Sequence, residues 1–328
     1  MSKKVSWLEK CWYQNSQFFW LLLPLSWLYG LITAIRRSLY RLGIKPQHRL
    51  AVPVIVVGNI SVGGTGKTPF TLMLCQLLIE QGWRPGIVSR GYGAKVVTPT
   101  LVTSDAKAEN VGDEPLLLAK RSGCPVVVYP NRVQAAEYLL QQTDVDIIIS
   151  DDGLQHYALQ RDVEIVLVDG LRGLGNQQLL PAGPLREKRW RLSKVDLVIS
   201  NSQPLPYADG VMQLIPTAAK ALNSDKTLPP SAVNLVAAIG NPTRFANTAK
   251  QAGFTILQQR YFVDHHQFTA ADFSQMATPI LMTEKDAVKC TSFAQDDWFS
   301  LTVNAKLDAT AAAKLSILLT QLRSTYGP

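Results

Sequence analysis

The chain has 328 residues, of which 47% are hydrophobic and 18% are charged, with a net charge of +8 and four scattered cysteines. This composition excludes an intrinsically disordered protein and leaves room for two domains or one large one. The cysteines form no C-x-x-C pair and no short spacing, which argues against a zinc site or a disulfide framework and predicts a reducing compartment.

The first 50 residues carry most of the positive charge. They contain eight lysines and arginines against a single acidic residue, Glu9, so the rest of the chain is nearly neutral. A basic surface spread along the protein would indicate a nucleic-acid partner. Because the charge is confined to one segment, we expect no nucleic-acid partner.

Residues 18–35 form an uncharged run, FFWLLLPLSWLYGLITAI, which two arginines close, and four of the seven tryptophans fall in the first 27 residues. Aromatic and basic residues together are typical of a membrane–water interface. As a helix the run spans about 27 Å, barely a hydrocarbon core, and Pro24 and Gly30 interrupt it. We therefore predict a membrane-associated helical segment over residues 1–45. An interfacial or shallowly inserted helix is favoured over a spanning anchor and over an ordinary buried helix, and a secretory signal is disfavoured because no small-x-small cleavage site follows.

Residues 55–70, IVVGNISVGGTGKTPF, join an apolar run to a glycine-rich turn and the start of a helix. In such a turn backbone N–H groups close around phosphate oxygens, while Lys67 supplies a positive charge and Thr68 a hydroxyl for Mg²⁺. Ser61 replaces the first glycine of the usual G-x-x-x-x-G-K-[ST] pattern. The alternative, a turn that only packs a helix on a strand, is weaker. The predicted nucleotide-binding residues are Ser61, Val62, Gly63, Gly64, Thr65, Gly66, Lys67 and Thr68.

From residue 52 to residue 200, short apolar runs alternate with helical stretches at the spacing of β-α-β units. The runs are too apolar for strands that face water on one side, which indicates a parallel sheet covered by helices on both faces. The predicted strands are 52–57, 84–89, 125–129, 146–150, 164–168 and 196–200, and the predicted helices include 68–81 and 132–142.

Beyond residue 201 five prolines interrupt the pattern, which suggests a linker or a change of sheet. Strands at 235–239, 255–258, 280–282 and 301–303, with a closing helix at 310–322, would form a smaller α/β unit. The predicted fold class is therefore α/β, with a P-loop NTPase-like parallel sheet, a smaller C-terminal α/β lobe and an N-terminal membrane-interacting helix. The expected boundaries are 46–203 for the P-loop domain and 204–328 for the lobe, and a cleft between them would suit an enzyme that joins two substrates.

The apolar strand 146–150 ends at Asp151 and Asp152. Beside a P-loop, carboxylates at a strand end are the arrangement that holds Mg²⁺, whereas a turn that only terminates the strand is the alternative. Asp151 is the predicted metal-side carboxylate, with Asp152 and Thr68 in the same metal site. His156 reaches the same cleft or lies in a solvated loop, and both interpretations stay open.

Phosphoryl transfer to a hydroxyl is assisted by a carboxylate that takes the proton. Asp113 lies in Gly-Asp-Glu-Pro before an apolar helix, where the local sequence favours a helix N-cap. The other candidate is Asp264-His265-His266, because an acid beside an imidazole tunes a base near neutral pH. A metal site or an inert polar loop are the alternatives, and three adjacent ligands do not match zinc spacing.

Two further stretches carry unusual side chains. Arg186 and Glu187 lead into four more cations around Trp190, which would bind an anionic headgroup or form a solvated helix face. Residues 283–286, Thr-Glu-Lys-Asp, follow an apolar run and would line the cleft, but they do not match the guanine-reading N-K-x-D motif. GTP specificity therefore has little support.

Taken in order, the segments GNISVGGTGKTP, SRGYG, GDEP, DDGLQH, LPAGPLRE, GNPTRF, DHHQF and TEKDAVK resemble those of the tetraacyldisaccharide 4'-kinase (lipid A 4'-kinase) family of Gram-negative bacteria. The resemblance runs from the N-terminal hydrophobic helix to about Cys290, and that family shares the serine at position 61. It implies transfer of the ATP γ-phosphate, with Mg²⁺, to the 4'-hydroxyl of a tetraacylated glucosamine disaccharide 1-phosphate. It also implies a peripheral or monotopic enzyme on the cytoplasmic face of the inner membrane. We expect no obligate protein partner.

The same resemblance implies roles for single residues. It matches Asp113 and His265 to an Asp–His dyad that acts on the acceptor hydroxyl, which changes the local interpretation of Asp113 from helix cap to base, while His266 stays open as the partner. Other matched positions are Lys67 and Thr68 in the P-loop, Asp151 and Asp152 at the metal, and, with less definite roles near the site, Arg132, His156, Arg186 and Glu187. The alternative function is a membrane-associated P-loop ATPase or GTPase switch without a lipid acceptor.

Overall fold

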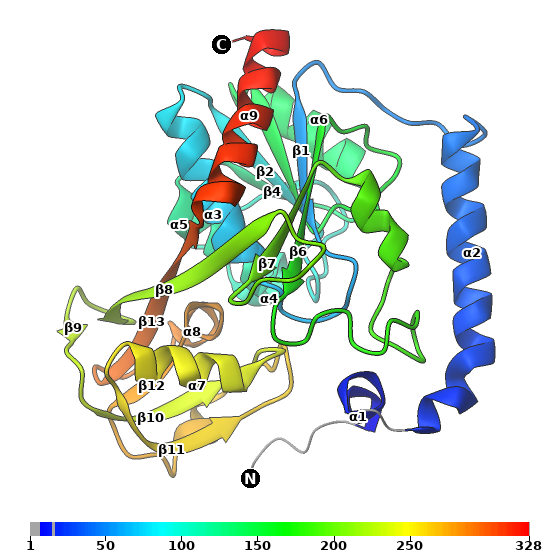
Figure 1. The fold of residues 1–328 in the computed structure, drawn as a ribbon. Helices are drawn as coiled ribbons and strands as arrows, with labels where there is room; N and C mark the ends of the chain where they lie inside the picture. The colour runs from blue at the N-terminus through cyan, green and yellow to red at the C-terminus, as the bar shows by residue number, and fades with distance from the viewer. Residues whose placement is uncertain (1–6, 15–16, 328) are drawn as a thin grey trace.

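The computed structural model describes residues 7–14 and 17–327. One mixed sheet of 13 strands runs through this part of the chain, and helices cover it on both faces (Figure 1). Three N-terminal elements, α1 (Trp7–Tyr13), the 3-10 helix η1 (Gln17–Leu22) and α2 (Leu23–Arg41), lie along one side of the sheet. The α/β fold class predicted from the sequence is confirmed.

The larger half of the sheet is parallel, in the order β7-β6-β1-β5-β2-β4, with β3 (Thr100–Leu101) antiparallel at its edge. Its strands consist of buried residues, as the uninterrupted apolar runs predict. They are β1 (Val54–Gly58), β2 (Pro85–Ser89), β4 (Val126–Val128), β5 (Ile147–Asp151), β6 (Val163–Asp169) and β7 (Leu197–Asn201).

Alternate strand residues pack against helices on opposite faces. Ile55 and Val57 belong to a core with α3 (Lys67–Glu80), α5 (Asp113–Ser122) and the C-terminal helix α9 (Ala309–Tyr326). Val54 and Val56 belong to a second core with α6 (Arg132–Gln142) and the segment 154–192, which includes the 3-10 helix η2 (Arg189–Lys194). The short helix α4 (Ala108–Val111) precedes α5. The carboxyl ends of the parallel strands therefore open between these two layers, where ligands bind in such sheets.

The long strand β8 (Gly210–Ala221), which the proline-rich pattern did not predict, joins the two halves of the sheet. It pairs in parallel with β7 and antiparallel with β13 (Trp298–Leu307), while β9 (Thr227–Leu228) pairs at its end. Pro216 lies in β8 at the position where the register with β13 shifts. A proline is tolerated within a strand at such an irregularity, so the linker interpretation was wrong for this stretch.

The smaller half of the sheet has the order β11-β10-β12-β13 and is parallel throughout. Its own hydrophobic clusters lie on the two faces of β10 and β12, away from the larger cores. Its elements are β10 (Ala232–Ala237), α7 (Pro242–Gln251), β11 (Thr255–Tyr261), the 3-10 helix η3 (Ala270–Phe273), β12 (Ile280–Thr283) and α8 (Glu284–Cys290). After β13 the chain returns, as α9, to the core of the larger half. The boundaries 46–203 and 204–328 stay a prediction.

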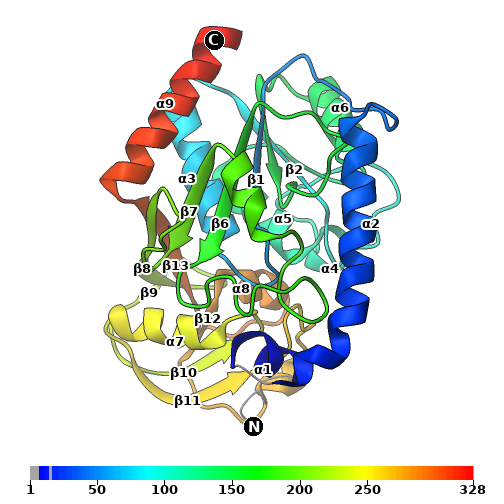
Figure 2. The ribbon, with the colours of Figure 1, turned by 45° about the vertical axis from the view of Figure 1, so that its right-hand side comes forward.

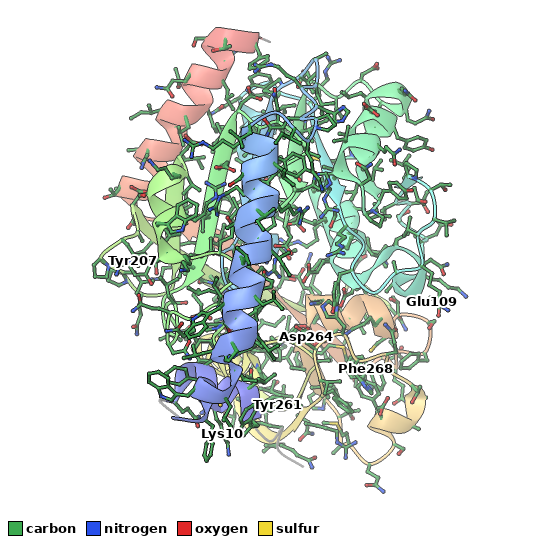
Figure 3. The ribbon with its side chains drawn as sticks, turned by 90° about the vertical axis from the view of Figure 1, so that its right-hand side faces the viewer. Lys10, Glu109, Tyr207, Tyr261, Asp264 and Phe268 are labelled. Carbon is green, nitrogen blue, oxygen red and sulfur yellow. The ribbon has the colours of Figure 1, made fainter. Side chains whose placement is uncertain are left out.

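Helix α2 lies along the outside of the molecule (Figures 2 and 3), and many of its apolar side chains are exposed. Trp27 is 69% exposed and Leu31 58%, whereas the polar side chains of Ser26 and Tyr29 donate hydrogen bonds to the carbonyls of Leu179 and Arg186 at 2.8 and 3.2 Å. The helical stretch Phe18–Arg41 has a mean hydropathy of 1.8, and only 11% of its most apolar 18 residues is buried. This exposure excludes the interpretation of α2 as an ordinary buried helix. By length and composition alone, the helix could cross a membrane.

Candidate active site

A cavity of about 860 Å³ lies at the carboxyl ends of β2 and β5, between the two halves of the sheet. The larger half contributes the P-loop and the start of α5. The smaller half contributes the start of α7, the loop after β11 and the start of α8. This volume falls in the range of pockets that bind small molecules and cofactors. Predicted site residues in its wall are Val62, Gly63, Gly64, Thr65, Gly66, Lys67, Thr68, Asp113, Asp151, Asp152, Arg186 and His265.

The P-loop is held from two sides. Ser61 forms an antiparallel bridge with Leu185, and the amide of Val62 donates to the Pro184 carbonyl at 2.8 Å. Gly66 has a φ of +91°, and a Cβ atom there would lie 2.5 Å from the Asn201 side-chain nitrogen. Glycine is therefore required at position 66. Ser61 instead lies in a paired, strand-like segment, whose backbone conformation any residue can adopt. This explains how the loop accommodates its departure from the usual pattern.

The carboxylates of Asp151 and Asp152 lie in different electrostatic surroundings. Asp152 Oδ1 lies 3.5 Å from Lys67 Nζ, and both of its oxygens lie 3.0 Å from Arg186 Nη1. Burial would raise the pKa of Asp152, but Lys67 and Arg186 lower it to about 2. Asp151 is buried and accepts a hydrogen bond from Thr71 at 3.4 Å, and burial together with nearby Glu114 raises its pKa to about 7. Lys67 and Arg132 oppose this rise, but neither outweighs the effect of burial.

Such a set of oxygen donors fits Mg²⁺. A hydroxyl and two carboxylates are hard ligands, and Mg²⁺ keeps several waters and substrate phosphates instead of requiring a protein cage. In keeping with this, residues 7–14 and 17–327 contain no group of three or more His, Cys, Asp or Glu side chains arranged as a metal cage. Thr68, Asp151 and Asp152 are the residues that would hold the ion.

Arg132 and His156 lie behind the cavity wall and not in it. Arg132 is buried, and its guanidinium donates to the backbone carbonyls of Asp151 and Tyr129 at 3.1 Å each. Its amide donates to Nε2 of His156 at 3.3 Å. Burial and the adjacent Arg132 charge lower the pKa of His156 to about 4, so the imidazole is neutral at physiological pH. Both residues brace the end of β5, which neither open interpretation of His156 anticipated.

Glu187 is buried beside Arg186 and faces away from the cavity. Its carboxylate accepts hydrogen bonds from Tyr157 at 2.7 Å and from Gln155 at 2.8 Å, and Arg191 Nε lies 3.4 Å from it. Gln155 itself lines the cavity. Glu187 therefore orients a cavity residue from behind.

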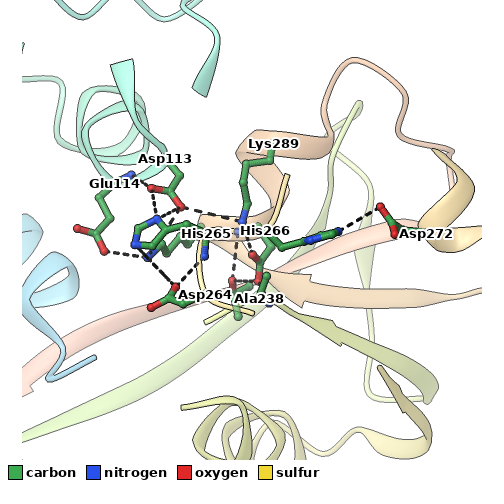
Figure 4. Close-up of polar contacts among 11 residues, drawn as sticks. Asp113, Glu114, Ala238, Asp264, His265, His266, Asp272 and Lys289 are labelled. Carbon is green, nitrogen blue, oxygen red and sulfur yellow. Dashed lines mark hydrogen bonds and ion pairs between the residues drawn. The ribbon is translucent and has the colours of Figure 1, made fainter. Parts of the chain in front are cut away.

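On the opposite wall, Asp113 and His265 face each other (Figure 4). His265 Nδ1 lies 3.2 and 3.1 Å from the two carboxylate oxygens of Asp113. Asp113 opens α5, with Gly112 as the N-cap residue, and its Oδ1 also accepts the amide of Glu114 at 3.0 Å. The local N-cap interpretation was thus wrong by one residue.

His265 has a left-handed backbone, with a φ of 61°, which is uncommon for a residue other than glycine. Its neighbour His266 points away from the cavity, stacks on Phe262 and lies 3.3 Å from Asp272 (Figure 4). The structure therefore brings His265, and not His266, to Asp113. The hydrogen bond with Asp113 raises the pKa of His265, against burial. Burial would raise the pKa of Asp113, but His265 and Lys285 lower it.

Four cations in the cavity wall, Arg90, Arg121, Arg244 and Lys285, were not among the predicted site residues, and Lys285 and Arg244 reach across the cavity. Lys285, at the start of α8, lies 3.0 Å from Glu114 Oε1 and 3.3 Å from Asp264 Oδ1. Arg244, in α7, donates to the Gly64 carbonyl at 2.7 Å and lies 3.3 Å from Asp169 Oδ2. The segments TEKDAVK and GNPTRF drew attention as motifs, but nothing in them singled out either residue, because every one of these contacts is long-range in sequence.

Comparison with known proteins gives a consistent result. Residues 18–323 match the family model of tetraacyldisaccharide-1-P 4'-kinase (LpxK). The chain is 51% identical over 305 residues to the tetraacyldisaccharide 4'-kinase of Shewanella sp. (strain MR-7), covering 92% of this chain and 91% of that protein. It is 50% identical over 325 residues to the corresponding protein of Shewanella oneidensis, covering 97% and 95%. The crystal structure of LpxK from Aquifex aeolicus in complex with ATP superposes with a TM-score of 0.77 at 30% identity, covering 93% of this chain and 99% of that one.

Proposed function

The chain belongs to the tetraacyldisaccharide-1-P 4'-kinase family, and we propose that its cavity transfers the γ-phosphate of ATP to the 4'-hydroxyl of a tetraacyldisaccharide 1-phosphate, in lipid A biosynthesis. One observation carries the proposal. A P-loop with paired strand-end carboxylates and an Asp–His pair line the same cavity from opposite walls. The first set suits a nucleoside triphosphate and the second a hydroxyl that must lose its proton.

The donor side is built from fixed positive groups. Backbone amides of residues 63–67 would bind the phosphate oxygens at the start of α3, and Lys67 and Arg186 would place positive charge beside them. When bound by Thr68, Asp151 and Asp152, Mg²⁺ would neutralise charge on the β- and γ-phosphates. Arg132 holds the carbonyl of Asp151 and so keeps that residue in place.

The acceptor side is built around Asp113. Its carboxylate takes the proton of the 4'-hydroxyl as the hydroxyl oxygen bonds to the γ-phosphorus and the bond from that phosphorus to the bridging oxygen of ADP breaks. The lowered pKa of Asp113 keeps it ionised and ready to accept a proton. His265 orients the carboxylate by a hydrogen bond, which it makes from a left-handed backbone.

We also propose that α2 brings the protein to its lipid acceptor at the cytoplasmic face of the inner membrane. Its outward face is apolar over several turns, and basic residues follow at its C-terminal end. This pattern favours a helix that lies in the headgroup region with its apolar side toward the acyl chains. The docked side of the same helix holds the segment 179–186, so the membrane surface and the cavity wall are physically connected.

The test incubates the full chain with γ-labelled ATP, Mg²⁺ and a tetraacyldisaccharide 1-phosphate in detergent micelles. We expect label in the lipid, at the 4' position, and loss of transfer in Asp113→Ala. If the label reaches only water, and Asp113→Ala behaves like the unmodified protein, the kinase assignment fails and an ATPase switch takes its place.

A further inference from the structure

Helix α2 docks on the rest of the protein through small and polar residues, while many of its apolar residues are exposed. Ser26 is 2% exposed, although its neighbours Leu25 and Trp27 are 54% and 69% exposed. Tyr29 and Gly30, which are half-buried, follow on the side of Ser26, because residues three and four apart share one face of a helix. The contact between α2 and the protein therefore depends on hydroxyl groups as well as on apolar packing.

Ser26 bonds twice to one short segment, residues 179–187, which we call the docking segment. Its Oγ donates to the carbonyl of Leu179 at 2.8 Å and accepts the amide of Ala182 at 2.9 Å. Hydrogen bonds are directional, so this pair fixes the place of the docking segment against α2. An alanine at position 26 would leave a buried carbonyl and a buried amide without their partner, which is unfavourable.

The docking segment also holds the start of the P-loop. The amide of Val62 donates to the carbonyl of Pro184 at 2.8 Å, and the amide of Arg186 donates to the carbonyl of Ile60 at 2.7 Å. These bonds immediately precede the loop whose amides would bind the phosphates. The place of the docking segment therefore sets the place of the P-loop.

Arg186 connects α2 to the metal side of the cavity. Its carbonyl accepts the Tyr29 hydroxyl at 3.2 Å, while its Nη1 lies 3.0 Å from both carboxylate oxygens of Asp152. One hydrogen bond and one ion pair thus join α2 to a carboxylate that would hold Mg²⁺. Tyr29 also lines the cavity, whereas Ser26 lies outside it.

We propose that Ser26 and Tyr29 are positioning residues for this kinase: through the docking segment, they hold the P-loop and Arg186 where ATP and Mg²⁺ bind. This inference rests on the function proposed above and deepens it. It gives α2 a second role beside its membrane contact, because the same helix then completes the nucleotide site. Loss of either hydroxyl weakens nucleotide binding even when no bilayer and no lipid acceptor are present.

Nucleotide affinity provides the test. Full-length protein in detergent is titrated by calorimetry with a non-hydrolysable ATP analogue in the presence of Mg²⁺. Because a neutral hydrogen bond contributes modestly, we expect Ser26→Ala, which loses two, to weaken binding by about 3- to 10-fold, and Tyr29→Phe by about 2- to 5-fold. Ser38→Ala and Tyr40→Phe are the matched controls and should bind like wild type. Both residues lie in α2, and their hydroxyls have no hydrogen-bond partner among residues 7–14 and 17–327.

Two further measurements separate positioning from general stabilisation. In Ser26→Ala, the KM for ATP should rise, while the KM for the lipid acceptor and the partition into vesicles stay unchanged. Hydrogen exchange of the amides of Val62 and Arg186, which join the docking segment to the P-loop, should be faster than in wild type. The amides of β5 should exchange as in wild type.

A folded Ser26→Ala variant that binds the ATP analogue as tightly as wild type overturns the proposal. Equal losses in Ser26→Ala and Ser38→Ala overturn it as well, since the effect would then come from the helix in general. If Ser26→Ala does not fold, Tyr29→Phe, which keeps the ring, decides by the same titration. A wild-type protein that binds the analogue but labels no lipid refutes the kinase function, while the binding data still decide the positioning role. A wild-type protein that binds no analogue refutes both.

Discussion

The Nδ1 atom of His265 lies 3.1 Å from Oδ2 of Asp113, although 152 positions separate these residues in the chain. Asp113 opens α5 in the larger half of the sheet, and His265 follows β11 in the smaller half. The contact therefore forms only when both halves are folded and in place. The pair of Asp113 and His265 is a property of the assembled molecule and of neither half alone.

The first prediction concerns this pair. Asp113→Asn removes the proposed proton acceptor and should lower kcat by about 10²- to 10⁴-fold, the usual contribution of general base catalysis. His265→Gln should lower it less, because glutamine can still donate to the carboxylate. The double variant should be no slower than Asp113→Asn, since residues that act as a unit are not additive. A double variant slower by the product of the two effects would mean that they act separately.

The second prediction concerns stability and pH. The folded protein raises the pKa of His265 above its ordinary 6.5, so this residue contributes stability below pH 6.5, and the contribution is lost as pH rises through the folded pKa. The pKa of Asp113 is lowered from 3.8, so its contribution is present above pH 3.8 and is lost as pH falls through the folded pKa. The pair therefore stabilises the protein most between these two ordinary values.

Urea unfolding of wild type and His265→Gln checks this. The difference in free energy of unfolding should be larger at about pH 5.5 than at about pH 9. Asp113→Asn supplies the control, because in that background the difference should lose its dependence on pH. An equal difference at both pH values would contradict the pairing.

The third prediction concerns the divalent ion. Chelation with EDTA should abolish phosphate transfer, because the phosphates lose the positive charge of the Mg²⁺ ion that Asp151 and Asp152 would hold beside them. Added Mg²⁺ should restore transfer. Asp151→Asn should raise the Mg²⁺ concentration needed for half-maximal rate by at least about tenfold, comparable to the loss of one charged ligand interaction. Asp146→Asn, at the opposite end of the same strand, where Asp146 accepts the Arg84 amide at 2.7 Å, is the control and should leave the Mg²⁺ requirement unchanged.

The fourth prediction concerns Arg244. Its guanidinium crosses from the smaller half to the P-loop carbonyl of Gly64 at 2.7 Å. Removing a charged hydrogen bond of this kind costs about 1.5–3 kcal/mol, so Arg244→Ala should weaken ATP binding by roughly 10- to 100-fold. Calorimetry with a non-hydrolysable ATP analogue measures this. Arg260→Ala removes an arginine of the same half that bonds to the Asp272 carbonyl instead, and its ATP affinity should match wild type. Equal losses in the two variants would point to general destabilisation.

The fifth prediction concerns the membrane. Leu31 in α2 and Ile317 in α9 are each 58% exposed, but only Leu31 lies on the outward apolar face of α2. Burying a leucine side chain in lipid contributes about 1.5–3 kcal/mol, so Leu31→Glu should reduce partition into anionic vesicles by roughly tenfold or more. Ile317→Glu should have no effect. A carbonate wash that leaves the wild-type protein in the membrane pellet would contradict an interfacial helix and indicate a spanning one.

The larger half of the fold was predictable because its signals are local. An uninterrupted apolar run such as Ile147–Ser150 is typical of a buried strand in a parallel sheet. The motif Gly66-Lys67-Thr68 marks the start of α3. Strand β8 was missed because Pro216 and its half-exposed residues break both the apolar run and the alternation that reveal strands. Strand β8 forms because it pairs with β13, a segment about 90 positions away in the chain, and no local sequence pattern indicates such a pairing.

The site divides in the same way. Lys67, Thr68, Asp151 and Asp152 stand at the ends of local elements, and their place in one cavity follows from sheet topology. The contact between Lys285 and Glu114 spans 171 positions, and the choice of His265 over its neighbour depends on a left-handed backbone. Neither could be read from composition or spacing, because both are consequences of how two distant segments pack.

The return of α9 to the larger core has a consequence for the order of folding. Ala311, Leu315, Leu319 and Leu322 belong to the hydrophobic core of the larger half and pack against β7 and β8, although α9 follows every strand of the sheet in the chain. On the ribosome that core stays incomplete until α9 emerges, which happens only after β10 to β13 have emerged and can pair among themselves. The nascent larger half therefore exposes apolar surface until that point, and we expect chaperone contacts to persist on it until α9 has packed.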